Sequence, residues 1–488
     1  MLVLRTTVCA AALCASLFGP LSAPVSAESI NDAIGSAYRY NPRLDAARAT
    51  LRALDETVAQ QNAGYRPTLN GAADVGYSNV ETDPRSATQS GETHPRGYSV
   101  TASQPLFRGF RVQNGVREAE ANVRAGRETL RNAEQTVLLE AATAYMDVVR
   151  DQAILRLRES NVAILSRELK AARDRFSVGE VTRTDVAQAE ASRANAVSQF
   201  DLAKSNLQTS RGNYERTVGR MPSSVSEPRS IEKRLPRTLE DAIGTSSKEN
   251  PLVVAALYRE QAARSTVDKT WGELLPSAQL DATYSKRLDP SPVLNSSEAT
   301  TVVGRLTVPI YSGGEIQARV RGTKQTHLAR IQEIEQNRTE VRALVVQAWS
   351  QLAASRAQVT SGGVQVQSNR TALTGVREEE KVGQRTLLDV LNAEQALLNA
   401  EVDLVTAKRN VVVFSYTVLQ TIGRLNVQEL GTNSDVYDAE VHYGEVRRKW
   451  WGIDITRNDG RREHHDLWAS HGERQQSGEP SKPAKPTK

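Results

Sequence analysis

The architecture of this chain depends on two related stretches, PTLNGAADVGY at residues 67–77 and PSAQLDATY at residues 276–284. After each opening proline, apolar or small residues occupy every second position, from Leu69 to Tyr77 and from Ala278 to Tyr284. A period of two is typical of a β-strand that has one apolar and one polar face. Both stretches therefore predict strands that lie between an apolar and a polar environment.

Each stretch begins a predicted hairpin. A polar loop rich in Pro and Ser follows at 81–96 and at 289–299. A return strand then carries alternating apolar residues, at Tyr98, Val100 and Ala102 in the first hairpin and from Val302 to Ile310 in the second. With about 10 to 12 residues each, the four predicted strands have the length of a tilted strand that crosses an outer membrane.

The two hairpins belong to a tandem duplication. The motif Asp-Ala-Ile-Gly at 32–35 recurs at 241–244, 209 positions later, and Val-Gly at 178–179 recurs at 382–383, 204 positions later. The separation between matching residues thus falls by five positions from the first match to the second, so a loop between them differs in length between the two repeats. We therefore divide the chain into a first repeat at 28–222, a linker at 223–236, a second repeat at 237–430 and a C-terminal tail at 431–488, predicted to be disordered after about 453.

Long helices fill most of each repeat. Asn41-Pro42 and Asn250-Pro251 are typical of a helix N-cap with proline in the first turn. After the return strands no proline occurs until Pro222 or Pro480, and a helix from about 113 to 177 would extend ~100 Å. Apolar or small residues recur at coiled-coil spacing: Val162, Leu165, Leu169, Ala172 and Phe176, then Ala196, Phe200, Ala203 and Leu207, and in the second half Leu391, Leu398, Val402, Val405 and Val412.

The first 27 residues have the pattern of a cleavable secretory signal. They combine Arg5, an apolar stretch and the small-residue end Val25-Ser26-Ala27, so the mature chain is expected to begin at Glu28. The alternative, a retained membrane anchor at 2–18, is disfavoured because a spanning helix needs about 20 apolar residues. Both cysteines, Cys9 and Cys14, lie inside the signal, which argues against disulfide, metal-thiolate and cysteine-nucleophile chemistry.

Composition excludes several classes of function. Aromatic residues make up only 5% of the chain, which is poor material for several globular cores. The formal net charge of +5 is interspersed along the predicted helices, so no nucleic-acid footprint is indicated. No metalloprotease, serine-hydrolase or phosphate-loop motif occurs, and we predict neither an enzyme nor a bound cofactor.

Four strands cannot close a barrel, because the smallest outer-membrane barrels have eight. Open strand edges in lipid would leave backbone groups unpaired at a cost of several kcal/mol each. The chain is therefore expected to oligomerise. Three copies with cyclic symmetry give twelve strands and twelve long helical columns, whereas two copies give only eight strands and a narrower pore.

This pattern resembles the TolC family of outer-membrane efflux factors over about residues 28 to 430. The resemblance is carried by the segments RFSVGEVTRTDV at 175–186 and VGQRTLLDVL at 382–391, which correspond to the periplasmic tip turns of that family. The tail segment with Lys449-Trp450-Trp451-Gly452 is similar to the branch that serves type I secretion and multidrug export. The resemblance implies a trimer with a β-barrel in the outer membrane, a periplasmic α-helical barrel, a periplasmic adaptor and an inner-membrane RND or ABC transporter.

The same resemblance implies a gate at the tips. By motif position it falls on Arg385 and Asp389, with Thr184 and Asp185 of the first tip as partners. The tip turns themselves are expected to contact the adaptor through Val178, Gly179, Val382 and Gly383. Two positions depart from the family pattern: Glu380 replaces a tyrosine that commonly makes a gating contact, and Asn392 replaces the second aspartate of the entrance ring.

A structural role competes with gating at the tips. Thr182 with Asp185, and Thr386 with Asp389, fit a capping box, in which the threonine accepts from the first-turn amides and the acid bonds back. Gly179 and Gly383 fit the positions that follow a helix end. We expect both roles at Asp389, while Arg385 is either a gating cation or a solvated one.

The tail offers two further candidates. A metal site at His464, His465, His442 and His471 is disfavoured, because the surrounding sequence is polar, charged and low in apolar residues. Trp450 and Trp451 either anchor at a membrane interface or pack against the helices. For the whole protein, the main rivals to a duct are a non-channel periplasmic coiled-coil adaptor or surface stalk, and a periplasmic enzyme with helical arms.

Overall fold

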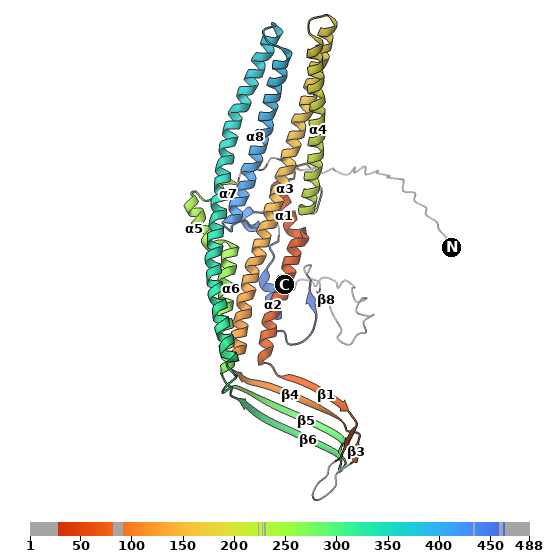
Figure 1. Ribbon diagram of the computed structural model, residues 1–488, viewed down its shortest axis with the longest axis vertical. Helices are drawn as coiled ribbons and strands as arrows, with labels where there is room; N and C mark the ends of the chain where they lie inside the picture. Colours follow the sequence, from red (N-terminus) through yellow and green to blue (C-terminus); the bar gives the residue numbers. More distant parts are fainter. Residues whose placement is uncertain are drawn as a thin grey trace, which may run out of the picture.

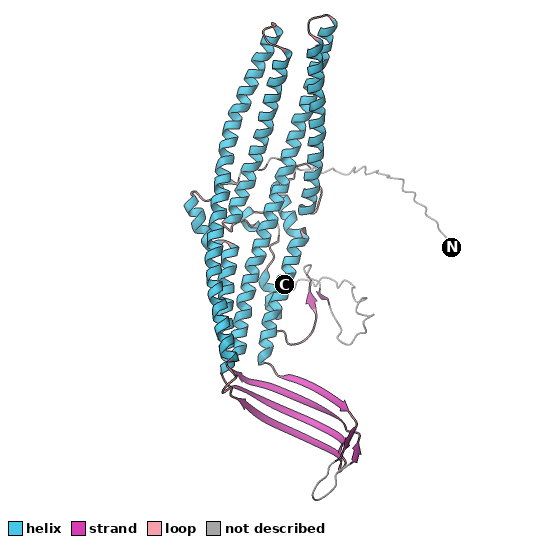
Figure 2. Ribbon diagram, viewed as in Figure 1, coloured by secondary structure: helices cyan, strands magenta, loops and turns pink. Residues whose placement is uncertain are grey.

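The computed structural model describes residues 28–81, 91–222, 224–226, 228, 231–432, 435–457 and 462–463. The predicted secretory signal lies outside them. The molecule is a long bundle of helices with a four-stranded β-sheet at one end and two helical hairpins at the other (Figure 1). Figure 2 shows that the helical and sheet regions meet at one narrow junction. Within the described residues no helix is both long and apolar enough to cross a membrane.

The sheet has four antiparallel strands in the order β1-β4-β5-β6. They are β1 (Thr68–Val75), β4 (Arg96–Arg108), β5 (Ser277–Ser291) and β6 (Leu294–Thr307). The register places Ala73, Val100 and Tyr284 on one face and Thr101 and Thr283 on the other, where their hydroxyl oxygens lie 3.2 Å apart. The sheet is one layer thick, with one apolar and one polar face, as the period of two predicts.

The hairpin ends differ from the prediction. No loop occupies 289–299, because β5 and β6 stay paired until Ser291 faces Leu294 and only two residues form the turn. The prediction of a loop was wrong because a polar strand end and a polar loop have the same composition. The second return strand also ends at Thr307, before Pro309. In the first hairpin, β3 (Gly91–Thr93) lies inside the predicted loop and pairs with β2 (Ser78–Val80), which directly precedes the loop.

Two helical hairpins account for most of the chain. The helices α3 (Arg111–Ser177) and α7 (Glu315–Lys381) have 67 residues each, which corresponds to about 100 Å. Each turns back into a shorter helix, α4 (Arg183–Val218) or α8 (Leu387–Thr421). The predicted coiled-coil positions Leu165, Leu169, Leu391 and Leu398 are buried, but Phe176 is 46% exposed, because it lies in the last turn beyond the packed region.

Four helical columns result from end-to-end stacking. The helices α2 (Pro42–Asn62) and α6 (Pro251–Trp271) lie on the same sides of α3 and α7 as the hairpin helices, but nearer the sheet. Each follows a short helix, α1 (Ile30–Tyr40) or α5 (Leu239–Glu249). Contacts define the column order as α2 with α4, then α3, then α6 with α8, then α7.

Equivalent asparagines of the two repeats make the two stacking joints. Asn41 caps its own helix, since its side-chain oxygen accepts from the amide of Arg43, while its Nδ2 donates 3.0 Å to the carbonyl of Thr217 at the end of α4. Asn250 accepts from the amide of Leu252 and donates 2.8 Å to the carbonyl of Thr421 at the end of α8. The sequence predicts the caps, and the structure adds the second bond, which ties two helices into one column.

The main core surrounds these joints. Its largest fully buried side chains are tyrosines, Tyr38, Tyr145, Tyr214 and Tyr416, each at most 2% exposed. The Tyr214 hydroxyl donates 2.7 Å to the carboxylate of Glu28, the expected first residue of the mature chain. The core therefore holds the N-terminus where the columns are stacked.

The remaining elements are short. They are the 3-10 turns η1 (Ala63–Tyr65), η2 (Glu232–Arg234) and η3 (Gly272–Leu274), the helices α9 (Val427–Leu430) and α10 (Ala439–Val446), and the strands β7 (Ile455–Thr456) and β8 (Arg462–Glu463). The helix α10 packs on α2, so the first part of the tail is ordered. Beyond residue 453, where the sequence predicts disorder, β7 pairs with β8 and residues 464–488 lie outside the described chain.

We predict that Asn250→Ala destabilises the helical region by about 1–3 kcal/mol, because it removes a cap and leaves a partly buried carbonyl without its donor. Asn41→Ala should have a similar effect at the other joint. Chemical unfolding followed by circular dichroism measures the loss. Thr421→Ala is the matched control, since it keeps the accepting carbonyl; equal losses in Asn250→Ala and Thr421→Ala would contradict the role of the joint.

Candidate functional site

The two tip turns have the same construction. After α3, the amide of Gly179 donates to the carbonyl of Phe176 and the amide of Glu180 to that of Arg175, both at 3.0 Å. After α7, the amide of Gly383 donates to the carbonyl of Glu380 and the amide of Gln384 to that of Glu379, both at 2.9 Å. Both glycines are left-handed, with φ of +81° and +78°. This conformation strains residues with a side chain, which explains glycine at both turns.

The return helices begin with the two predicted capping boxes. In the first, the amide of Asp185 donates 3.2 Å to the Thr182 hydroxyl, and the Asp185 carboxylate accepts from the Thr182 amide at 2.8 Å. In the second, Asp389 and Thr386 make the same bonds at 3.3 and 3.0 Å. Hydrogen bonds from the Thr386 amide and hydroxyl lower the pKa of Asp389. The carboxyl group of Asp389 therefore stays charged in the first turn of α8.

The predicted gate residues do not meet within one chain. Arg385 donates through Nε to Glu379 of its own hairpin at 2.9 Å, and in the described residues no hydrogen bond joins Arg385 or Asp389 to Thr184 or Asp185. This bond to Glu379 raises the pKa of Arg385. Contacts between chains are the remaining route for gating, which stays a prediction.

The other predicted tip residues face solvent. Thr184 is exposed in the first turn of α4, and Asn392 is exposed in the second turn of α8. Val178 and Val382 are each 70% exposed beside the tip glycines. These two apolar side chains occupy matching places in the two turns and are available to a partner. Contact of the tip turns with an adaptor stays a prediction.

Sequence reasoning missed a contact between the two hairpins. Arg175, in the last turn of α3, forms an ion pair with Glu380, in the last turn of α7. The Glu380 side chain is only 16% exposed, and the hydrogen bond to it raises the pKa of Arg175. Glu380, which replaces a tyrosine common in the family, therefore holds the two tips of one chain together. The available signal was opposite charge in the last turns before the two tip glycines.

A second pair of contacts follows the duplication. Arg173 pairs with Glu190 across the first hairpin, and Arg377 pairs with Glu394 across the second, 204 positions later. Glu394 is 5% exposed, and its burial raises the pKa of its carboxyl group. Aligning the two repeats would have revealed this pair, because all four residues keep their type.

A metal site finds no support in the described residues, which contain no group of three or more His, Cys, Asp or Glu side chains that could hold an ion. His442 instead bonds through Nδ1 to the buried Asp55 at 3.0 Å, and this contact pins α10 to α2. His464, His465 and His471 lie outside the described residues.

Comparison with known proteins agrees with this arrangement. The family model described as outer membrane efflux protein matches residues 33–220 and 242–424, which is one match to each half of the duplication. The chain belongs to this family. Its members are outer-membrane channel proteins, so the protein is placed in the outer membrane with its helices in the periplasm.

Individual relatives span nearly the whole chain. The outer membrane efflux protein BepC of Brucella suis is 38% identical over 431 residues, covering 87% of this chain and 92% of the relative. The outer membrane protein TolC of Escherichia coli is 24% identical, covering 83% and 84%. The solved structure of VceC from Vibrio cholerae superposes with a TM-score of 0.70 at 19% identity, covering 81% of this chain and 96% of that one.

The outer membrane channel CmeC of Campylobacter jejuni superposes with a TM-score of 0.73 at 17% identity and covers 86% of this chain and 89% of that one. At this level of identity the structural matches establish the fold alone. They confirm the prediction of a TolC-like fold. The family match and the relative BepC confirm the prediction of an outer-membrane location.

We predict that Arg175→Glu speeds amide hydrogen exchange in the last turns of α3 and α7 roughly fivefold, because a partly exposed ion pair contributes about 1 kcal/mol. The double variant Arg175→Glu with Glu380→Arg should restore slow exchange. Arg183→Glu, an exposed change in α4, is the control. Fast exchange in the double variant would show that the pair does not hold the hairpins together.

Proposed function

We propose that three copies of this chain form a continuous duct through the outer membrane and the periplasm. The observation that carries this proposal is the four-stranded sheet, whose edge strands β1 and β6 are each paired on one side only in the described chain. Unpaired backbone groups cost several kcal/mol each in lipid, so the edges require a neighbour. Pairing of β1 of one copy with β6 of the next satisfies every edge when the ring closes.

Three copies fit the known dimensions of such barrels. Twelve strands enclose a wider lumen than the eight that two copies supply, and the polar face with Thr101, Thr283 and Asp281 would line it. The apolar face would then contact lipid. The four columns of each chain would continue the strands as a barrel of twelve helical columns.

The duct would be the outer-membrane component of a tripartite efflux or type I secretion system. Relatives of both kinds support this assignment: BepC is named an efflux protein, and AprF of Pseudomonas aeruginosa, 26% identical over 322 residues, is named an alkaline protease secretion protein. In this role the chain conducts drugs, toxic compounds or secreted proteins passively, without catalysis or a cofactor. An inner-membrane RND or ABC transporter supplies the energy, and a periplasmic adaptor contacts the exposed tip turns.

The rival proposal of a periplasmic adaptor or surface stalk explains only the helices. It gives no reason for a one-layered sheet with an apolar face and two open edges. A periplasmic enzyme with helical arms is disfavoured for the same reason.

The entrance of the duct would be controlled at the second tip. Arg385 and Asp389 of one protomer would meet Thr184 and Asp185 of the next, because the structure leaves no such contact within a chain. The exposed Asn392, one turn further into α8, supplies no charge to the entrance ring. We therefore expect this entrance to bind cations less strongly than one with two carboxylates in each protomer.

We predict that the protein is recovered from the membrane fraction as a detergent-extracted trimer, because only ring closure pairs the edges of β1 and β6. Size-exclusion chromatography with multi-angle light scattering measures the mass of the protein component. Proline at Thr301 in β6 should reduce the trimer, since it removes a backbone donor from the strand. A soluble monomer released by osmotic shock would refute the duct.

We predict that Arg385→Ser and Asp389→Ala each raise single-channel conductance in a planar bilayer, because each removes one side of the proposed contact between protomers. Thr386→Ala separates gating from capping, since it weakens the cap and keeps the carboxylate of Asp389. Equal increases in Thr386→Ala and Asp389→Ala would assign the effect to tip rigidity. Unchanged conductance in Arg385→Ser and Asp389→Ala would leave only the capping role.

A further inference from the structure

The tail segment RRKWW at residues 447–451 exposes two adjacent tryptophans. Trp450 is 69% and Trp451 81% exposed, and Ile453 and Ile455 beyond them are 48% and 52% exposed. Large apolar side chains gathered on a surface typically mark a site of contact with a protein or a membrane. Tryptophan in particular concentrates at membrane–water interfaces, where its ring is buried and its N–H stays near water.

The segment is held mainly through its backbone. Asn62, at the end of α2, donates 3.3 Å to the carbonyl of Arg447, and Arg66 donates 2.8 Å to the carbonyl of Lys449. The guanidinium of Arg66 also lies over the Trp450 ring at 4.6 Å. The tail is thus fixed by its backbone, while most of both indole surfaces stays free.

These contacts place the tryptophans at the edge of the membrane. Arg66 precedes Thr68, the first residue of β1, by two positions, which is about 7 Å of extended chain. Because β1 runs from the helical region into the membrane, its first residue marks the periplasmic boundary. The two tryptophans therefore lie at the level of the inner leaflet of the outer membrane.

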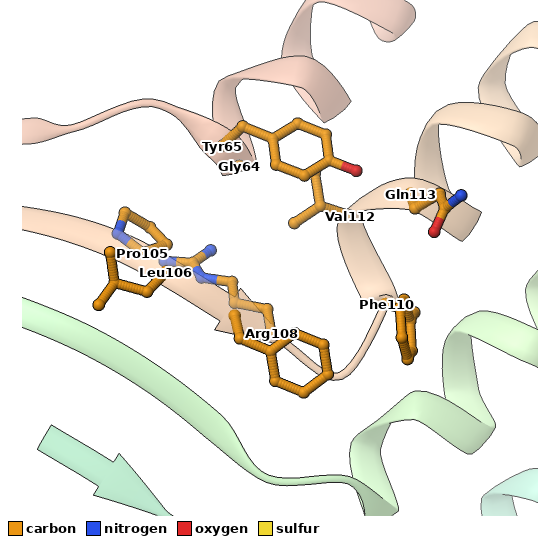
Figure 3. A pocket seen from close by; sticks show the side chains of 9 residues that line it. Gly64, Tyr65, Pro105, Leu106, Arg108, Phe110, Val112 and Gln113 are labelled. Atoms are coloured by element: carbon orange, nitrogen blue, oxygen red, sulfur yellow. The ribbon is translucent and has the colours of Figure 1, made fainter.

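The junction of helices and sheet also has an apolar surface. A cavity of about 240 Å³ opens at the junction of helices and sheet, next to Arg66 in the chain. Figure 3 shows Tyr65, Leu106 and Phe110 around it, with Arg108 as the one charged residue among those that line it. Aromatic and apolar groups with a cation between them resemble the composition of an interfacial belt.

The segment itself carries three cations, Arg447, Arg448 and Lys449. Arg447 pairs with Glu120 at 3.0 Å, and Lys449 donates to the carbonyl of Asp454. Arg448 is exposed and forms no hydrogen bond or ion pair within the part of the chain that the structure describes. A free cation beside two exposed indoles complements a surface that carries phosphate groups over hydrocarbon.

We propose that residues 447–451 form a lipid anchor that inserts Trp450 and Trp451 into the inner leaflet of the outer membrane, with Arg448 on the phosphate of an anionic phospholipid. The anchor adds a contact outside the strands, which fixes the depth of the junction and ties the tail to the membrane. It rests on the part of the proposed function in which β1 enters the membrane, and it requires no particular cargo or gate.

Fluorescence quenching by brominated lipids tests the anchor in the full-length protein. The protein is reconstituted in vesicles of phosphatidylcholine with brominated phosphatidylglycerol, and quenching is compared with the double variant Trp450→Phe with Trp451→Phe. We expect the double variant to lose a large quenched component, while part of the remaining quenching comes from Trp271, which is 51% exposed near the start of β5.

The matched control is Trp349→Phe. Trp349 is packed against the helical core about 51 Å along α7 from its start, so its removal should leave the quenched component unchanged. Arg448→Gln should weaken quenching by brominated phosphatidylglycerol but not by brominated phosphatidylcholine, and added salt should do the same in the wild type.

Two outcomes would overturn the anchor. If Trp450 and Trp451 emit as water-exposed indoles without quenching, they do not enter the bilayer, and their surface is available to a soluble partner instead. If they emit at short wavelength without quenching, a neighbouring protomer covers them. Single-channel conductance of the double variant separates this proposal from the duct, because we expect it to stay at the wild-type value in every case.

Discussion

Backbone hydrogen bonding in a medium without water constrains the whole of this structure. The sheet has four strands and two open edges, and each unpaired amide or carbonyl in lipid costs several kcal/mol. A soluble protein tolerates an open edge because water satisfies it. Here the edges demand identical neighbours, and this demand leads to the proposed ring of three chains and to the polar lumen inside it.

The helices extend the same symmetry away from the membrane. A column more than 100 Å long needs continuity, yet only α3 and α7 supply it within one helix. The other two columns are assembled end to end, and Asn41 and Asn250 each close a joint with two bonds. Because both asparagines occupy the same place in the duplication, the two halves stack in the same manner and the columns stay parallel.

At the far end, the residues that make the tips rigid are also those that we propose to control the entrance. The left-handed glycines and the capping boxes fix where each return helix begins, and this position would place Asp389 at the proposed entrance. The ion pair of Arg175 with Glu380 then ties the two hairpins of a chain together. The proposed closed state would depend on other contacts, those between protomers. These contacts could open without unfolding either tip.

The sequence by itself determined the elements of local origin. The period of two, the Asn-Pro caps, the tip glycines and the Thr-x-x-Asp boxes depend on residues close in the chain, so local physics predicts them, and the duplication is visible at fixed separation. It failed where composition is ambiguous, as at 289–299, where a polar strand resembles a loop. Only the tertiary structure decided which distant groups meet: the second bond of Asn41 to Thr217, the pairing of Glu380 with Arg175, and the position of Trp450 over Arg66. Each joins residues more than one hundred and seventy positions apart, and their contact is set by the packing of columns that no local pattern specifies.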